Sequence, residues 1–148
     1  MAGPAPTEAL QRLAHELGLT DRVEWVLDPD DDALARLYRR ASVLLFPSLY
    51  EGFGWPVLEA MAFGLPVVVS DRGSLAEVVG DAAACLPLGD ENGFVYAVNR
   101  ILGSPESAIE FSKRGLARAG EFGTAVFAKR MQEAYLAAIA THQRAVVV

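Results

Sequence analysis

Two carboxylates bracket a glycine-rich stretch that could bind a phosphorylated ligand. Glu51 and Glu59 are separated by seven residues, and Gly52 and Gly54 follow the first of them closely. Glycines let a backbone come close to a ligand, and the N-terminus of a helix offers free N–H groups and a dipole end that suit a phosphate. An ionised carboxylate accepts hydrogen bonds and donates none. Glu51 and Glu59 are therefore suited to the hydroxyls of a ribose or a hexose.

The elements around this stretch predict where the site lies. Residues 43–46 form a continuous apolar run, which is typical of a strand covered on both faces of a parallel sheet, and Pro47 ends it. Pro56 suits the first turn of a helix because its missing N–H is not needed there, and this helix is expected to end at Gly64. Ligands of open α/β sheets bind beyond the carboxyl ends of the strands. The loop between this strand and this helix is therefore the expected site.

The rest of the chain alternates strand and helix patterns and then continues with helix patterns alone. Residues 1–6 are expected to fray, and the spacing of Ser74 and Glu77 predicts a capping box. The other expected strands cover residues 22–27, 66–69 and 83–86, and the other helices begin near Thr7, Ala33, Ser74, Asp90, Ser104 and Thr124. This order predicts an α/β fold with a Rossmann-like parallel sheet of about four strands and C-terminal helices, as a single domain over residues 1–148.

Composition narrows the class of protein further. The chain has 148 residues, 52% of them hydrophobic, and a formal net charge of −6, which suits a globular domain and argues against a nucleic-acid partner. Cys85 is the only cysteine, so no internal disulfide can form, and the apolar run over residues 60–69 is too short and too broken to span a bilayer. No signal peptide is visible. We expect a cytoplasmic domain, with peripheral attachment of a longer enzyme to the membrane left open.

The central run resembles the motif of a known enzyme family. Residues 46–61 are similar to the run FPS…EGFGLPxLEAMA of the family-4 glycosyltransferases, and Glu51 and Glu59 match the E-x7-E motif of that family. The segments that follow are similar to its GxPVV and EVVG motifs, and the likeness extends over residues 7–140. These are retaining enzymes with two Rossmann domains, the GT-B architecture. The resemblance implies the donor-binding part of an enzyme that transfers a hexosyl group from a nucleotide sugar to a hydroxyl acceptor.

The resemblance also implies a role for each matching residue. Glu51 would be the catalytic residue beside the donor sugar, and Glu59 would accept hydrogen bonds from the ribose hydroxyls. The loop whose backbone would approach the sugar and the diphosphate consists of Gly52, Phe53, Gly54 and Trp55. The segment that would lie against the base consists of Val26, Leu27 and Asp28. The donor would be a UDP-, GDP- or ADP-sugar, and neither a metal ion nor another cofactor is expected.

The sequence departs from the family pattern in three places. Leu27 stands where a glycine is common, and Trp55 replaces a smaller aliphatic residue; we favour packing of Trp55 on its helix over stacking on the ligand. In the family, an acceptor domain and the first two strands of the donor domain precede the part that matches, and they carry an Arg and a Lys that grip the diphosphate. We therefore expect the isolated chain to be inactive. We also expect the strand at 23–26 to pair with that at 43–46, unless another chain covers this sheet edge.

A hypothesis from another class stays open. The chain could be a non-catalytic half-domain that binds a nucleotide or pairs with a partner chain, including a second copy of itself. An apolar stripe on the last expected helix favours this hypothesis, because an exposed stripe of this kind invites a partner; it consists of Phe127, Met131, Ala134 and Ala138. A sugar-nucleotide epimerase or a phosphorylase of related architecture is disfavoured, since neither is expected to carry the Glu51–Glu59 run. The base, the sugar and the acceptor stay undetermined.

Overall fold

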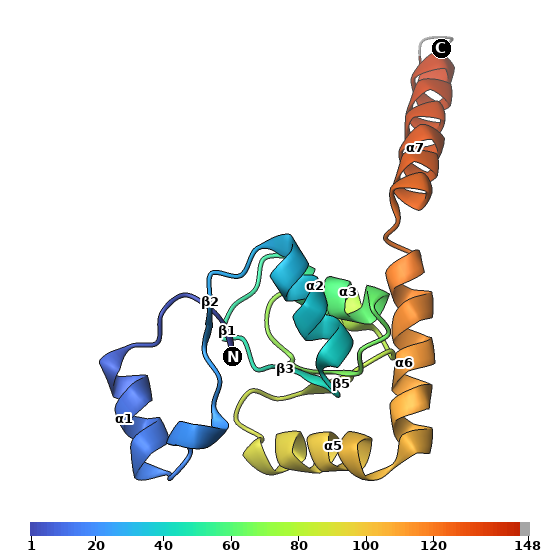
Figure 1. The fold of residues 1–148 in the computed structure, drawn as a ribbon. Coiled ribbons are helices and arrows are strands. Elements are labelled where there is room, and N and C mark those ends of the chain that lie inside the picture. The colour runs from blue at the N-terminus through green and yellow to red at the C-terminus, as the bar shows by residue number, and fades with distance from the viewer. Residues whose placement is uncertain (146–148) are drawn as a thin grey trace. The chain divides into compact units, whose positions relative to one another are not determined.

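A computed structural model describes residues 1–145 of the chain (Figure 1). These residues form two compact units, residues 1–41 and residues 42 onward. Every strand pairing is parallel, and helices alternate with the strands. The predicted α/β fold class is therefore confirmed. Across the described residues, no helix combines the length and the apolar character that crossing a membrane requires.

The first unit pairs two short strands, β1 (Ala2–Gly3) and β2 (Val26–Leu27). Three predictions are wrong here. The N-terminal residues do not fray, because the amide of Val26 needs an acceptor and finds the carbonyl of Met1 at 2.8 Å. The strand expected over residues 22–27 is shorter, because Thr20–Arg22 forms a 3₁₀ helix, η1. The expected pairing of this strand with residues 43–46 is replaced by the pairing of β2 with β1.

Two capped helices complete the first unit, as the sequence predicts. They are α1 (Glu8–Glu16) and α2 (Asp31–Arg40). The Thr7 side chain accepts a hydrogen bond from the amide of Leu10 at 3.3 Å. The carboxylate of Asp30 accepts one from the amide of Ala33 at 2.7 Å. Each side chain satisfies one of the amides that the first turn of a helix leaves without a partner.

The second unit is built on a three-stranded parallel sheet in the order β3-β4-β5. The strands are β3 (Leu44–Phe46), β4 (Val67–Ser70) and β5 (Ala84–Leu86). All residues of the central strand β4 are buried, which is typical of a parallel strand covered on both faces. The sheet has fewer strands than the four or so expected, because the segment around Val26 pairs within the first unit.

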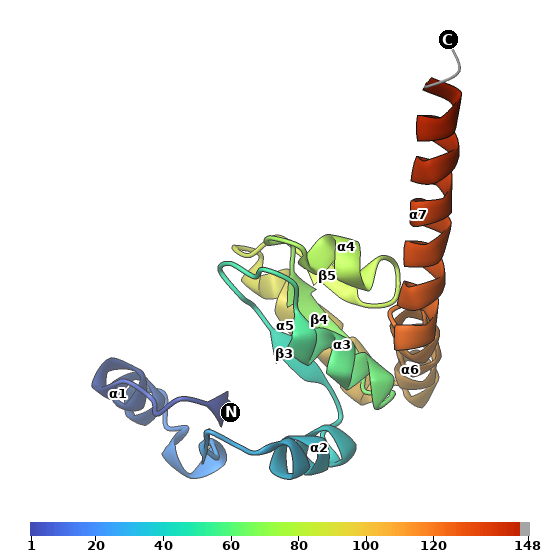
Figure 2. The ribbon, with the colours of Figure 1, turned by 90° about the horizontal axis from the view of Figure 1, so that it is seen from above.

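Helices cover both faces of this sheet. The helices of the unit are α3 (Trp55–Ala62), α4 (Leu75–Val79), α5 (Glu91–Gly103), α6 (Pro105–Gly120) and α7 (Thr124–Ala145). Figures 1 and 2 show α3 on one face of the sheet and α5 on the other. Val68 packs against a buried cluster on the α5 side, which consists of Phe94, Ala97, Ile101 and Phe111. This core fixes the sheet on which the β3–α3 loop stands.

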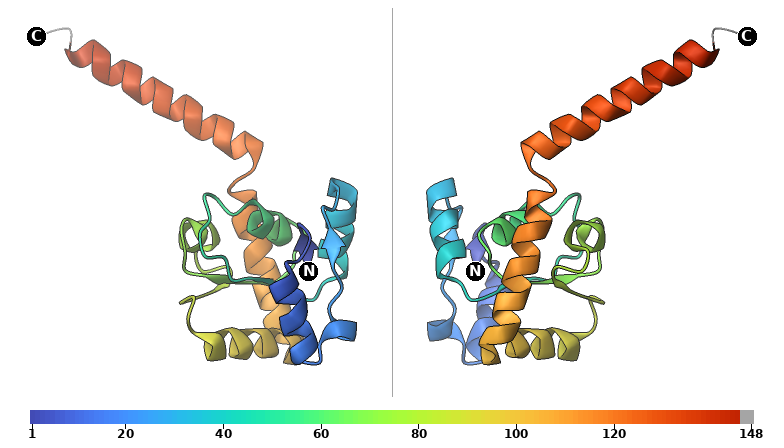
Figure 3. Two further views of the ribbon diagram at one scale, coloured as in Figure 1. Left: turned by 90° about the vertical axis from the view of Figure 1, so that its left-hand side faces the viewer. Right: turned by 90° about the vertical axis from the view of Figure 1, so that its right-hand side faces the viewer.

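The last helix, α7, is one continuous helix (Figure 3). Its apolar side chains are exposed over most of residues 124–142. Phe127 is 62% exposed and Tyr135 is 64% exposed. Met131 lies between them and is also exposed, as are Ala134 and Ala138. The predicted stripe therefore faces solvent in the described part of the chain.

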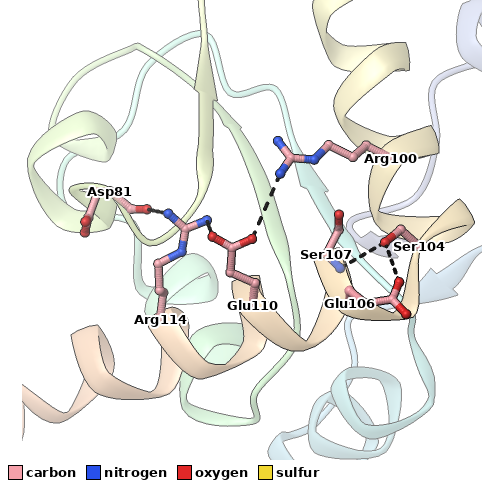
Figure 4. Close-up of polar contacts among 7 residues, drawn as sticks. All are labelled: Asp81, Arg100, Ser104, Glu106, Ser107, Glu110 and Arg114. Carbon is pink, nitrogen blue, oxygen red and sulfur yellow. Dashed lines mark hydrogen bonds and ion pairs between the residues drawn. The ribbon is translucent and has the colours of Figure 1, made fainter.

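Polar contacts anchor α6 to its neighbours (Figure 4). Arg114 donates to the carbonyl oxygen of Asp81 at 3.1 Å and pairs with Glu110 at 3.2 Å. Glu110 also faces Arg100 of α5 at 4.0 Å. Because these side chains are substantially exposed, we assign most of the packing free energy to the apolar core beneath them.

Replacing Phe111 with alanine tests this assignment. We expect the free energy of unfolding to fall by about 3 kcal/mol, because the change leaves a cavity between α6 and β4. Ile109→Ala on the same helix is the control: Ile109 is exposed, so we expect a loss below about 1 kcal/mol. Urea unfolding followed by circular dichroism measures both values. Equal losses in the two variants would show that the buried cluster does not stabilise the unit as described.

Candidate functional site

The loop between β3 and α3 is held at the carboxyl end of the central strand. The Ser70 hydroxyl, at the end of β4, donates to the carbonyl oxygen of Ser48 at 2.6 Å. Ser70 is fully buried, and a buried hydroxyl without a partner would destabilise the fold. The Ser48 hydroxyl in turn donates to the carbonyl oxygen of Tyr50 at 2.9 Å. These bonds tie the first half of the loop to the sheet.

Ser74 holds the second half of the loop. Its amide donates to the carbonyl oxygen of Glu51 at 3.4 Å, and its hydroxyl donates to that of Phe53 at 2.9 Å. The predicted capping box with Glu77 is therefore wrong. The Ser74 hydroxyl accepts no hydrogen bond from α4, because Ser74 has helical φ and ψ of −82° and −5° and not the extended backbone of a cap residue.

Two glycines make this close approach possible. Gly73 has a φ of +59°, and a Cβ atom there would lie 2.2 Å from the carbonyl oxygen of Glu51. Gly54 has a φ of +98°, and its Cβ would lie 2.9 Å from Cδ2 of Leu75. A side chain at either position would both strain the backbone and displace its neighbour. The space that Gly54 leaves is thus filled by Leu75 from within the protein.

The first turn of α3 offers amides to a ligand. The amides of Val57 and Leu58 both donate to the carbonyl oxygen of Gly54 at 3.1 Å. Pro56 has no N–H group. Within residues 1–145, the amides of Gly54 and Trp55 donate to no backbone acceptor. Together with the helix dipole, they form an environment that favours an anion.

The two motif glutamates lie on different elements of the second unit. Glu51 is half-buried in the loop, and Glu59 is exposed on α3. Gly52, Phe53, Gly54 and Trp55 connect the loop to the helix. The predicted catalytic, sugar-binding and ribose-binding positions thus follow one another along the chain from the loop after β3 into α3.

Trp55 does not pack on its helix as we favoured from the sequence. Its side chain is 62% exposed, and its ring lies against Phe53 with the ring centroids 4.7 Å apart. Phe53 also meets the edge of Phe122, with centroids 6.0 Å apart. A hollow of about 450 Å³ adjoins these rings, and it is lined by Phe53, Trp55, Glu121, Phe122, Phe127 and Arg130. Sequence spacing could not reveal this contact, because Phe122 is distant in the chain.

The predicted base-binding segment belongs to the first unit, whereas the other predicted site residues belong to the second. Val26 and Leu27 form β2, and Asp28 follows it with a φ of +41°. Among the described residues, Asp28 is the only one other than glycine with a positive φ. The conformation that favours glycine therefore occurs at Asp28 and not at Leu27, and aspartate is one of the residues that tolerate it.

The loop after β4 carries a pair of opposite charges. Arg72 Nε lies 3.4 Å from Oδ1 of Asp71, and both side chains are partly exposed. Burial, and then the charge of Asp71, raise the pKa of the Cys85 thiol. The thiol is therefore protonated at neutral pH and unsuited to act as a nucleophile. No three His, Cys, Asp or Glu side chains of the described chain gather in a way that could hold a metal ion.

Ser70, Gly73 and Ser74 were missed as site residues from the sequence. The signal for Ser70 is a serine that ends an apolar strand, and the signal for Gly73 is a glycine directly before a helix. Either signal alone is weak, since both are common. Ser70, Gly73 and Ser74 count as site residues because each of them contacts the loop between β3 and α3.

Known proteins resemble this chain over most of its length. The chain is 39% identical over 119 residues to the MMP alpha-(1->4)-mannosyltransferase of Mycolicibacterium hassiacum, a match that covers 78% of this chain and 29% of the relative. It is 35% identical over 145 residues to the D-inositol 3-phosphate glycosyltransferase of Streptomyces griseus, which covers 97% of this chain and 31% of the relative. It superimposes on a sucrose-phosphate synthase from Thermosynechococcus elongatus with a TM-score of 0.78 and 33% identity, covering 94% of this chain and 37% of that one.

The chain spans about a third of the length of the curated relatives it matches. Residues 1–118 match the model of the family described as glycosyl transferases group 1, which is most of the sequence. The chain therefore belongs to the group 1 glycosyl transferases.

Proposed function

We propose that this chain is the nucleotide-sugar-binding portion of a retaining, family-4 glycosyltransferase. Residues 1–148 would form a single, partial donor domain of the GT-B architecture. The full-length enzyme would transfer a hexosyl group from a UDP-, GDP- or ADP-sugar to a hydroxyl acceptor. The observation that supports this most is the placement of Glu51 and Glu59 around a loop that Ser70 and Ser74 hold at the strand ends.

Each element of the site has a part in this proposal. The diphosphate would lie at the first turn of α3, near the amides of Gly54 and Trp55. Glu59 would accept hydrogen bonds from the ribose hydroxyls, and Glu51 would lie beside the donor sugar. Transfer breaks the bond between the anomeric carbon and the diphosphate, so positive charge develops on the sugar and negative charge on the leaving group. Preorganised groups that match both charges lower the barrier most effectively.

The proposed chemistry requires no resident metal ion or cofactor. The first turn of α3 would offset part of the diphosphate charge, and Arg72, which follows β4, could add a positive charge. The remaining cations, the acceptor site and the base contacts outside Val26, Leu27 and Asp28 would come from parts of the longer enzyme. For this reason we propose that the isolated chain does not catalyse transfer.

We also propose partners and a location. An N-terminal acceptor domain or another chain would cover the edge of β3, where Leu45 is 48% exposed. A nucleic-acid partner is disfavoured by the net charge of −6. A cytoplasmic location, with peripheral membrane attachment of the full-length enzyme as an alternative, suits a chain with a single cysteine.

One observation favours a second candidate function. The exposed apolar side chains of α7, including Phe127 and Tyr135, would suit a half-domain that pairs with a partner chain or with a second copy of itself. This candidate requires no catalysis. It differs from the first in that nucleotide affinity need not depend on Glu59.

Titration calorimetry with UDP, GDP and ADP distinguishes the two candidates. We expect one of them to bind the wild-type chain and Glu59→Ala to weaken that binding about tenfold or more, because the change removes charged hydrogen bonds to the ribose. Glu91→Ala is the matched control, since Glu91 is an exposed glutamate at the start of α5. Binding that is unchanged in Glu59→Ala would contradict the proposed role, and no binding of any nucleotide would favour the second candidate.

Gly73→Ala tests the contact that holds the loop. A Cβ atom at Gly73 would lie 2.2 Å from the Glu51 carbonyl oxygen, so the loop must move. We expect nucleotide affinity to fall about tenfold or more, with a loss of stability of about 1–3 kcal/mol from the strained backbone. Gly89→Ala is the control, because a Cβ there would meet nothing within 4 Å. If both variants bind nucleotide as the wild type does, the proposed dependence of nucleotide binding on the Gly73 contact is contradicted.

Nucleotide release from UDP-, GDP- and ADP-hexoses measures the activity of the isolated chain. With simple hydroxyl acceptors, we expect no turnover above the enzyme-free background. Ordinary enzymes turn over at about 1–1000 per second. A rate in that range for purified residues 1–148 would contradict the proposed inactivity.

A further inference from the structure

We propose that Arg118 is a positioning residue for the donor loop, defined here as residues 51–54. It would hold the loop by two routes, through α4 and through Phe122. The consequence for ligand binding rests on the function proposed above, whereas the positioning itself can be measured without a ligand.

The first route begins at the end of α4. Arg118 lies on α6, and its side chain is 25% exposed. Its Nε donates to the carbonyl oxygen of Val78 at 2.9 Å, and its Nη2 donates to that of Glu77 at 2.6 Å. The last carbonyls of a helix have no partner within the helix. A single guanidinium from α6 therefore caps the C-terminal end of α4.

The opposite end of α4 carries the contacts to the donor loop. Ser74 precedes α4, and it donates to the carbonyl oxygens of Glu51 and Phe53. The amide of Val78 donates back to the carbonyl oxygen of Ser74 at 2.9 Å. Because α4 has five residues, little more than one turn separates the two ends. A shift at the Arg118 end would therefore reach Ser74.

The second route runs through aromatic rings. The Arg118 guanidinium lies over the ring of Phe122, 4.9 Å from its centroid. The edge of Phe122 meets Phe53, with ring centroids 6.0 Å apart. The Arg118 Nη1 also pairs with Glu121, which holds the guanidinium at the end of α6. Since Ser74 bonds the Phe53 carbonyl, the two routes meet at the same residue and close a ring of contacts.

Arg114 provides a matched control from one turn earlier on α6. It donates to the carbonyl oxygen of Asp81 and pairs with Glu110 (Figure 4). It also lies over a phenylalanine ring, that of Phe111, at 5.0 Å. It thus resembles Arg118 in chemistry and in its anchoring role, but its bonds are made beyond the end of α4.

Amide hydrogen exchange by nuclear magnetic resonance tests the proposal on the ligand-free chain. In Arg118→Met, we expect exchange at Ser74 and Val78 to become about tenfold faster, because charged hydrogen bonds that hold α4 are lost and local opening becomes easier. The amides of Val68 and Val69 in β4 should keep their rates. In Arg114→Met, Ser74 and Val78 should exchange as in the wild type.

Two results with Arg118→Met would overturn the proposal. The first is an unchanged exchange rate at Ser74 and Val78. The second is an acceleration at Val68 and Val69 as large as that at Ser74 and Val78, because it would indicate a general loss of stability. If Arg118→Met does not fold, Phe122→Leu breaks the second route alone. It should still accelerate exchange at Ser74, and an unchanged rate would overturn that route.

Calorimetry then connects positioning to function. Arg118→Met should weaken the binding of whichever nucleotide the wild-type chain binds, by about tenfold, and Arg114→Met should not. If the wild type binds none of the three nucleotides, the proposed function fails while the exchange result still decides the positioning role. Amide exchange could be accelerated in Arg118→Met while its nucleotide affinity equals that of the wild type. This result would show that nucleotide binding does not depend on the position of the loop, and it would contradict the proposed effect of Arg118 on binding.

Discussion

The candidate site depends on how the β3–α3 loop satisfies its backbone carbonyls. A loop at the end of a buried sheet would leave these oxygens without partners, which native structures rarely tolerate. Here the Ser70 hydroxyl bonds Ser48, and Ser74 bonds Glu51 and Phe53. Because these donors come from β4 and from the residue before α4, the loop is fixed to the central strand and not only to its own ends. Gly73 lacks a side chain where the Glu51 carbonyl must fit.

This arrangement explains why the loop could serve a phosphorylated sugar. The loop carbonyls are bonded inward, while the amides of Gly54 and Trp55 have no backbone acceptor in the described chain. Amides without a backbone acceptor at the start of a helix favour an anion. Glu51 precedes these amides in the loop and Glu59 follows them on α3, and the proposed function assigns both carboxylates as acceptors for the hydroxyl groups of the donor. The same fixed loop brings Phe53 against Trp55 and Phe122, and the contact reaches α6 and Arg118.

Much of the fold follows from local sequence signals, and the errors share a physical cause. Thr7, Asp90 and Ser104 begin their helices as predicted, because a cap needs only the next few residues. Ser74 has the same local pattern, yet its backbone is helical and not extended, and its hydroxyl donates to the carbonyl oxygen of Phe53, which is distant in sequence. The N-terminal residues form β1 because the amide of Val26 needs an acceptor, which no local pattern displays. The E-x7-E spacing predicted the loop as the site, whereas the contacts of Gly73 and Arg118 join segments that only the folded chain brings together.

The most direct measurement is a titration of the isotope-labelled chain with UDP, GDP and ADP, followed by amide resonances. The central claim is that the β3–α3 loop and the first turn of α3 form a nucleotide-diphosphate site. It predicts saturable shifts at the amides of Gly52, Gly54 and Trp55, with small shifts in α5. Shifts confined to α5 and α6, or no saturable shift with any of the three nucleotides, would contradict it.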